Sequence, residues 1–154
     1  MERRATASAA VFVRRPPEQV FAYVADVSRH GQWSPKKLSM ADLPADGVLV
    51  AGSTFTSYGH LPGEDAHRND VRVLTLDHPR VLVLESTDLS GTYRNTFDVT
   101  EQGEGSVVTR QLDLPRPDGA LGLMVPLFVR LVLGRDLAKG LRRLASQLHS
   151  QGEG

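Results

Sequence analysis

The segment from Arg15 to Pro35 constrains the fold of this chain more than any other. Its first prolines, Pro16 and Pro17, end a strand-like run, because proline has no backbone N–H to donate to a sheet. The same prolines can open a helix, since the first helical turn does not need those donors. Trp33 then closes the segment on a turn. Between them, apolar residues recur at helical spacing and predict a short amphipathic helix: Val20, Phe21, Val24 and Val27.

The chain around this segment consists mainly of strand-like runs. Ala5 to Arg14 predicts a first strand from its Val, Thr and Phe content. Leu38 to Gly47 is expected to be a polar loop, and Val48 to Val50 a short strand. Because the connections are short and the strands sequential, an antiparallel meander is the simplest arrangement. Its further strands are predicted at residues 52–58, 69–76, 81–87, 93–100 and 106–114.

A long helix is predicted at the C-terminal end of the chain. Pro126 is expected either to open this helix or to kink it. An antiparallel sheet of about seven strands twists and curls, so a helix laid against it can leave a hollow. The order of elements therefore predicts a two-layer α+β fold. The apolar stripe of the helix is Leu121, Val125, Phe128, Val132, Leu137, Leu141, Leu144 and Leu148.

Composition sets limits on the function. A chain of 154 residues is expected to form one domain, residues 1–154. The zero formal net charge argues against a nucleic-acid partner. The absence of cysteine excludes disulfides and thiolate chemistry and fits a cytoplasmic location. The most apolar stretch, Leu121 to Leu133, is interrupted by Pro126 and Arg130 and falls short of the ~20 residues that span a bilayer, so no stable membrane insertion is expected.

Four short motifs resemble those of one known family, in the same order along the chain. Pro16 to Asp26, with Trp33-Ser34-Pro35, resembles the opening of START-like proteins, the SRPBCC or helix-grip superfamily. Ala51 to Phe55 resembles the glycine-then-aromatic motif of their second strand. Asp77 to Leu82 resembles their acidic-proline-arginine turn, and Gly105 to Thr109 their glycine-hydroxyl hairpin exit. The resemblance covers nearly the whole chain and is nearest to the polyketide cyclase/dehydrase-like branch.

The resemblance implies a helix-grip fold. In that α+β fold, a curved antiparallel sheet of about seven strands wraps on a long C-terminal helix, with two short helices after the first strand. It also implies a cavity between sheet and helix that binds an apolar or amphipathic small molecule, lipid- or polyketide-like. It implies no particular reaction, because members range from lipid carriers to cyclases. A monomer or homodimer without cofactor is expected.

Strand alternation predicts which residues line this cavity. If Phe97 faces the long helix, Tyr93 and Asn95 face it too, because side chains alternate along a strand. Val108 and Arg110 share that face on the next strand. Side chains from the long helix are expected to close the hollow, with a tryptophan at its rim. The predicted ligand-binding residues are Trp33, Asn69, Tyr93, Asn95, Phe97, Val108, Arg110, Met124 and Phe128.

Arg110 has the most informative chemistry of this set. A guanidinium on an inward strand face is ion-paired, or binds an oxygen-rich ligand, or reaches water past its apolar stem. Tyr93 and Asn95 can hydrogen-bond a ligand carbonyl or hydroxyl, or water. Trp33 can pack in the core or stack on a flat ring.

No catalytic residue and no metal site is assigned from the sequence. His60 and His67 have a suitable pKa for acid–base chemistry, but their spacing matches no zinc signature. His30 and His149 are expected on the surface. Gly59 breaks the strand alternation in this region, so the face assignment of residues 55–67 stays open.

Three functions remain open from the sequence. The first is a small-molecule binder, and a dry apolar tunnel opening near Trp33 or near residues 61–67 favours it. The second is a polyketide cyclase, aromatase or dehydratase, and convergent polar side chains deep in the cavity favour it. The third is a protein-interaction role that uses an exposed surface of residues 121–133.

Overall fold

A computed structural model describes residues 4–60, 66–89, 91–115 and 119–151 of the chain. The strands are β1 (Arg4–Val13), β2 (Lys37–Ala41), β3 (Thr54–His60), β4 (His67–Asp77), β5 (Val81–Asp88), β6 (Gly91–Gln102) and β7 (Gly105–Pro115). The helices are α1 (Pro17–Ala25), α2 (His30–Trp33), α3 (Ala120–Phe128) and α4 (Gly134–Gln151). A 3-10 turn, η1 (Val27–Arg29), precedes α2, and a π-helical turn, η2 (Val129–Leu133), joins α3 to α4.

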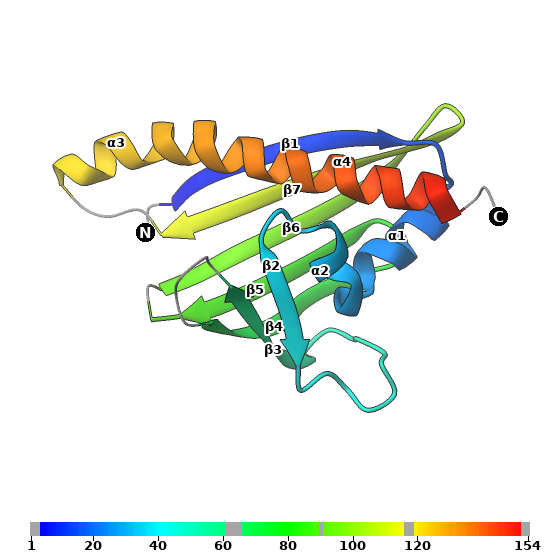
Figure 1. The fold of residues 1–154 in the computed structure, drawn as a ribbon, viewed down its shortest axis with the longest axis horizontal. Helices are drawn as coiled ribbons and strands as arrows, with labels where there is room; N and C mark the ends of the chain where they lie inside the picture. Colours follow the sequence, from blue (N-terminus) through cyan, green and yellow to red (C-terminus); the bar gives the residue numbers. More distant parts are fainter. Residues whose placement is uncertain (1–3, 61–65, 90, 116–118, 152–154) are drawn as a thin grey trace.

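The seven strands form one antiparallel sheet in the order β1-β7-β6-β5-β4-β3-β2. The predicted meander is confirmed from β3 to β7, β2 adds an unpredicted edge strand beside β3, and β1 pairs with β7, with Ala5 opposite Leu114. A register shift between Val73 and Thr75 of β4 interrupts the pairing with β5, and such bulges increase local twist. Figure 1 shows the long helix running beside β1 and β7, with α1 near its C-terminal end.

The predicted helix after the diproline is confirmed as α1. Pro17 lies in its first turn, as does Glu18, whose charge favours the positive end of the helix dipole. The apolar face packs into the sheet, and the hydroxyl of Tyr23 donates a hydrogen bond to Gln147 Oε1 on α4. This bond ties α1 to the long helix across the core. The buried residues of α1 are Val20, Phe21, Tyr23 and Val24.

The second half of the long helix follows the predicted apolar stripe, whereas the described side chains of the first half follow it only at Val125, which packs against the core. Leu141, Leu144 and Leu148 of α4 are fully buried. In α3, the predicted stripe residue Phe128 is 61% exposed. Pro126 lies inside α3, and the π-helical turn η2 follows it directly. A π turn adds a residue per turn, so a pattern of 3.6 residues loses register there. Figure 1 shows α3 reaching past the ends of β1 and β7.

The region between Trp33 and β3 differs from its sequence prediction. Residues 37–41, expected in a polar loop, form β2 and pair with β3 from Lys37–His60 to Ala41–Thr56. Residues 48–50, expected as a strand, have no strand pairing, and Val48 and Val50 are 58% and 60% exposed. Residues 37–41 can form an edge strand because such a strand needs only one partner, here β3, and one apolar face, which Leu38 and Met40 supply.

No helix in the described ranges is long and apolar enough to cross a membrane.

A candidate ligand-binding cavity

A cavity of about 430 Å³ lies between the concave face of the sheet and the long helix. Strands β2 to β7 supply most of its wall, and Leu133, at the end of η2, supplies the helical side. Its apolar lining is Leu38, Met40, Phe55, Val71, Leu84, Phe97, Leu112, Leu114 and Leu133. Its polar lining is His30, Lys36, Ser57, Asn69, Ser86, Asp88, Tyr93, Asn95 and Arg110.

Five of the nine predicted residues line this cavity. Asn69 lies on β4, Tyr93, Asn95 and Phe97 on β6, and Arg110 on β7. The alternation used to place them is therefore correct on all three strands. On β3, where the sequence left the face open, Phe55 and Ser57 line the cavity, which places Tyr58 and His60 on the opposite face.

The other four predicted residues lie elsewhere, which corrects their expected positions. Trp33 and Val108 are 1% and 0% exposed and pack in the main core, so Trp33 does not form a rim. Met124 and Phe128 are 74% and 61% exposed and do not close the hollow. The reason for the helical error is the π turn after α3, because the helix presents Leu133 to the cavity instead.

The cavity has a buried inner end and a polar outer end. On β6, Tyr93 lies near the start of the strand, and Phe97, 1% exposed, lies where the strand enters the core. Arg110 is the register partner of Phe97 and so lies at the same depth. Asp88 and the exposed Lys36 line the outer end. The inner end brings together a group that we name the inner cluster: His30, Trp33, Asn95, Phe97 and Arg110.

Arg110 is held by an amide and two aromatic rings. Its Nε and Nη2 both donate to Asn95 Oδ1, at 3.2 and 3.0 Å. Its Cζ lies 5.2 Å from the Phe97 ring centroid and 5.7 Å from that of Trp33, within cation–π range. No carboxylate of the described residues pairs with it. Loss of hydration on burial lowers the pKa of Arg110 to about 10, so the side chain remains cationic at neutral pH.

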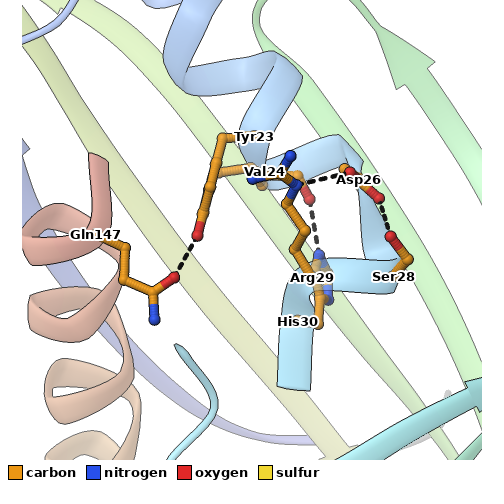
Figure 2. Close-up of polar contacts among 7 residues, drawn as sticks. All are labelled: Tyr23, Val24, Asp26, Ser28, Arg29, His30 and Gln147. Atoms are coloured by element: carbon orange, nitrogen blue, oxygen red, sulfur yellow. Dashed lines mark hydrogen bonds and ion pairs between the residues drawn. The ribbon is translucent and has the colours of Figure 1, made fainter. Parts of the chain in front are cut away.

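His30 lies in the inner cluster, not on the surface as predicted. Its side chain is buried against Trp33, with ring centroids 4.8 Å apart. Its Nε2 lies 2.7 Å from the carbonyl oxygen of Val24 (Figure 2). A carbonyl only accepts, so Nε2 carries the proton and Nδ1 keeps its lone pair in the neutral ring. The sequence signal that could have shown this is the spacing of His30 and Trp33, because residues three apart in a helical turn lie on the same face.

Burial keeps His30 neutral at physiological pH. Desolvation, together with the positive charge of Arg110, lowers its pKa from 6.5 to about 4. The hydrogen bond to Val24 and the charge of Asp26 act in the opposite direction but are smaller than the desolvation effect. The inner end of the cavity therefore holds a cation and a neutral imidazole.

A small polar network holds the turn that carries His30. Asp26 accepts hydrogen bonds from Arg29 Nε at 3.0 Å and from the hydroxyl of Ser28 (Figure 2). These contacts stabilise η1, which leads directly into α2 and His30. The position of the imidazole is thus set by the backbone of α1 and by this turn.

The remaining histidines do not reach the cavity. His60 lies 3.3 Å from Ser39 Oγ, between β2 and β3. His78 packs edge-on against Phe21, and His149 Nε2 accepts a hydrogen bond from the backbone N–H of Arg14. Within the described ranges, no three His, Asp or Glu side chains are grouped so that they could hold a metal ion.

Comparisons with known proteins agree with this architecture. A family model described as polyketide cyclase/dehydrase and lipid transport matches residues 4–149. No curated protein matches the chain.

Solved structures resemble this chain along nearly its whole length. The di-domain ARO/CYC StfQ from the steffimycin biosynthetic pathway has a TM-score of 0.73 at 16% identity, over 98% of this chain and 52% of StfQ. The polyketide_cyc-like protein Cgl2372 from Corynebacterium glutamicum has a TM-score of 0.62 at 22% identity, over 96% of each chain. Ara h 8.0201 has a TM-score of 0.67 at 11% identity, over 96% of this chain and 99% of Ara h 8.0201. These similarities confirm the predicted helix-grip fold.

Proposed function

The chain belongs to the polyketide cyclase/dehydrase and lipid transport family, and we propose that it binds an apolar or amphipathic small molecule between its sheet and its C-terminal helix. The observation that carries this proposal is the cavity of about 430 Å³ on the concave face of the sheet. Cavities of this size and mixed lining are typical of small-molecule sites.

The residues that line the cavity offer a ligand two kinds of contact, apolar and polar. Apolar walls such as Leu84, Leu112 and Leu133 can bury a hydrocarbon surface, at about 25 cal/mol for each Å² removed from water. Polar groups of the inner cluster can orient a ligand oxygen. An amphipathic molecule satisfies both parts of the cavity.

Native mass spectrometry of protein purified from cells, followed by extraction of bound compounds, tests this function. We expect an apolar compound to be retained by the wild-type protein. Leu112→Trp should remove it, because the larger ring fills the cavity. Gln111→Trp is the matched control, since Gln111 is exposed on the opposite face of the same strand. Absence of any bound compound, together with no binding of added apolar probes, would contradict the proposal.

A second candidate function is that of a cyclase, aromatase or dehydratase. The observation that favours it is the convergence of Arg110, Asn95 and His30 at the inner end. His30 Nδ1 would take a proton from a carbon beside a carbonyl, and the electron pair would move to the carbonyl oxygen beside Arg110. Attack of that carbon on a second carbonyl would form the ring bond, and the new alkoxide would take the proton back from His30.

Proton exchange tests this second candidate without a known substrate. The protein is incubated with decan-2-one in D₂O, and deuterium incorporation beside the carbonyl is followed by NMR. Catalysis predicts incorporation above the uncatalysed rate, lost in His30→Phe and reduced in Arg110→Met. An exchange rate equal to that of buffer alone would rule out this enolising chemistry while leaving the binding function intact.

A further inference from the structure

We infer that the ligand of this cavity is an apolar carboxylate, whose carboxylate binds Arg110 while its hydrocarbon chain runs toward the outer end. This inference rests on the proposed binding function and specifies its ligand class. It follows from the hydrogen bonds of Arg110, from the distribution of charge in the cavity, and from the path that the apolar walls leave open.

Arg110 has donors that the protein does not use. Both of its hydrogen bonds, from Nε and Nη2, go to the single oxygen Asn95 Oδ1. Nη1 donates to none of the described residues, and the side chain is only partly buried, at the wall of the cavity. Because Asn95 Oδ1 accepts from Arg110, its Nδ2 remains as a second donor beside the guanidinium. Together these donors fit the two oxygens of a carboxylate.

Among the residues that the structure describes, none supplies a counterion to Arg110 at this depth. The carboxylate that lines the cavity, Asp88, lies on β5 six residues beyond Leu82, the partner of Phe97. At ~3.3 Å per residue, it lies about 20 Å from the level of Arg110. Asp26 acts on His30, but it is already bonded to Arg29 and Ser28. A cation that has lost part of its hydration is stabilised by an opposite charge, which a ligand carboxylate supplies.

An apolar path leads outward from this point. Leu112 and Leu114 follow Arg110 on the same face of β7, and Leu133 faces them from the helix. The path from Arg110 to Leu114 is about 13 Å long at ~3.3 Å per residue. This length suits a medium-length alkyl chain such as that of decanoate.

A set of three probes with the same chain tests the inference. Decanoate, decan-1-ol and decylamine are titrated by isothermal calorimetry and by fluorescence of Trp33, the only tryptophan of the chain. We expect decanoate to bind at least tenfold more tightly than decanol, and decylamine most weakly. Arg110→Met should remove the preference for decanoate while decanol binding is retained. Arg94→Met is the matched control, because Arg94 lies on the opposite face of β6.

The outcomes separate the inference from the proposed function. Equal binding of decanoate and decanol, or a preference that survives in Arg110→Met, would overturn the carboxylate inference and leave small-molecule binding in place. Binding of none of the three probes would contradict both. Arg110→Lys keeps the charge and guards against a folding defect in Arg110→Met, and it should retain part of the preference for decanoate.

Discussion

At the scale of single residues, His30 and Arg110 give the cavity its chemical character. The cation is held by one amide oxygen and two aromatic faces, and the imidazole by one carbonyl. Neither arrangement neutralises the charge of Arg110. Arg110 therefore supports both the carboxylate inference and the enolising chemistry, whereas His30 supports only the latter, and the two sets of variants distinguish these alternatives.

His30 makes the stability of the protein depend on pH. Its pKa falls from 6.5 to about 4 on folding, so the unfolded state binds the proton more readily between these values. Stability contributed by the neutral ring is complete above about pH 6.5 and is lost as the pH falls through about 4. Between these two pH values the free energy of unfolding decreases by a total on the order of 3 kcal/mol.

Urea unfolding between pH 4.5 and pH 7.5 measures this dependence. His30→Gln, which can still donate to the Val24 carbonyl, should flatten the acid limb of the stability curve. The same substitution at exposed His67 is the control for loss of an imidazole outside the core. An identical pH slope in His30→Gln and wild type would show that the buried imidazole does not titrate as described.

At the scale of elements, the C-terminal helix has two different halves. α4 buries a regular leucine stripe, whereas the α3 and η2 half carries a continuous exposed apolar surface. This exposed surface is the feature that the protein-interaction alternative requires. Its residues are Leu123, Met124, Leu127, Phe128, Leu131 and Val132.

Two glycines of α4 test how closely the helix packs. A Cβ at Gly140 would lie 3.2 Å from Pro35 Cδ and 3.4 Å from the carbonyl oxygen of Trp33, whereas one at Gly134 would meet nothing within 4 Å. Gly134→Ala should therefore raise the free energy of unfolding by about 0.5–1 kcal/mol through helix propensity. Gly140→Ala should gain nothing or lose stability, because Pro35, just after α2, must move. Chemical denaturation compares the two, and an equal gain in both would show that the segment from Trp33 to Pro35 does not pack tightly on α4.

At the scale of the whole molecule, the sheet and helix form one structure around a partly filled interior. A ligand that binds only the folded state stabilises it, by about 2.7 kcal/mol at a concentration of 100 times its Kd. Thermal unfolding with decanoate should therefore show a Tm higher by about 5–10 °C. Leu112→Trp should abolish the shift and Gln111→Trp should keep it. A shift of equal size in Leu112→Trp would place the binding site outside the cavity.

The sequence predicts the strands best where period-two alternation is unbroken. On β6 and β7 it places Tyr93, Asn95 and Arg110 on the cavity face, as the structure confirms. It fails at β2, a short edge strand, because few residues carry the pattern there. It also fails at α3, where the π turn changes the helical period, so Met124 and Phe128 lie outside the cavity.

The sequence by itself determined the order of the elements apart from the edge strand β2, the inward face of the long strands and the family of the chain. These features depend on local backbone chemistry and on periodic patterns, which single segments contain. Only the tertiary structure decided that His30 and Trp33 lie deep in the core, and that Arg110 bonds to Asn95 with no carboxylate partner in the described part of the chain. Burial and charge pairing depend on segments far apart in the chain, so no local pattern specifies them.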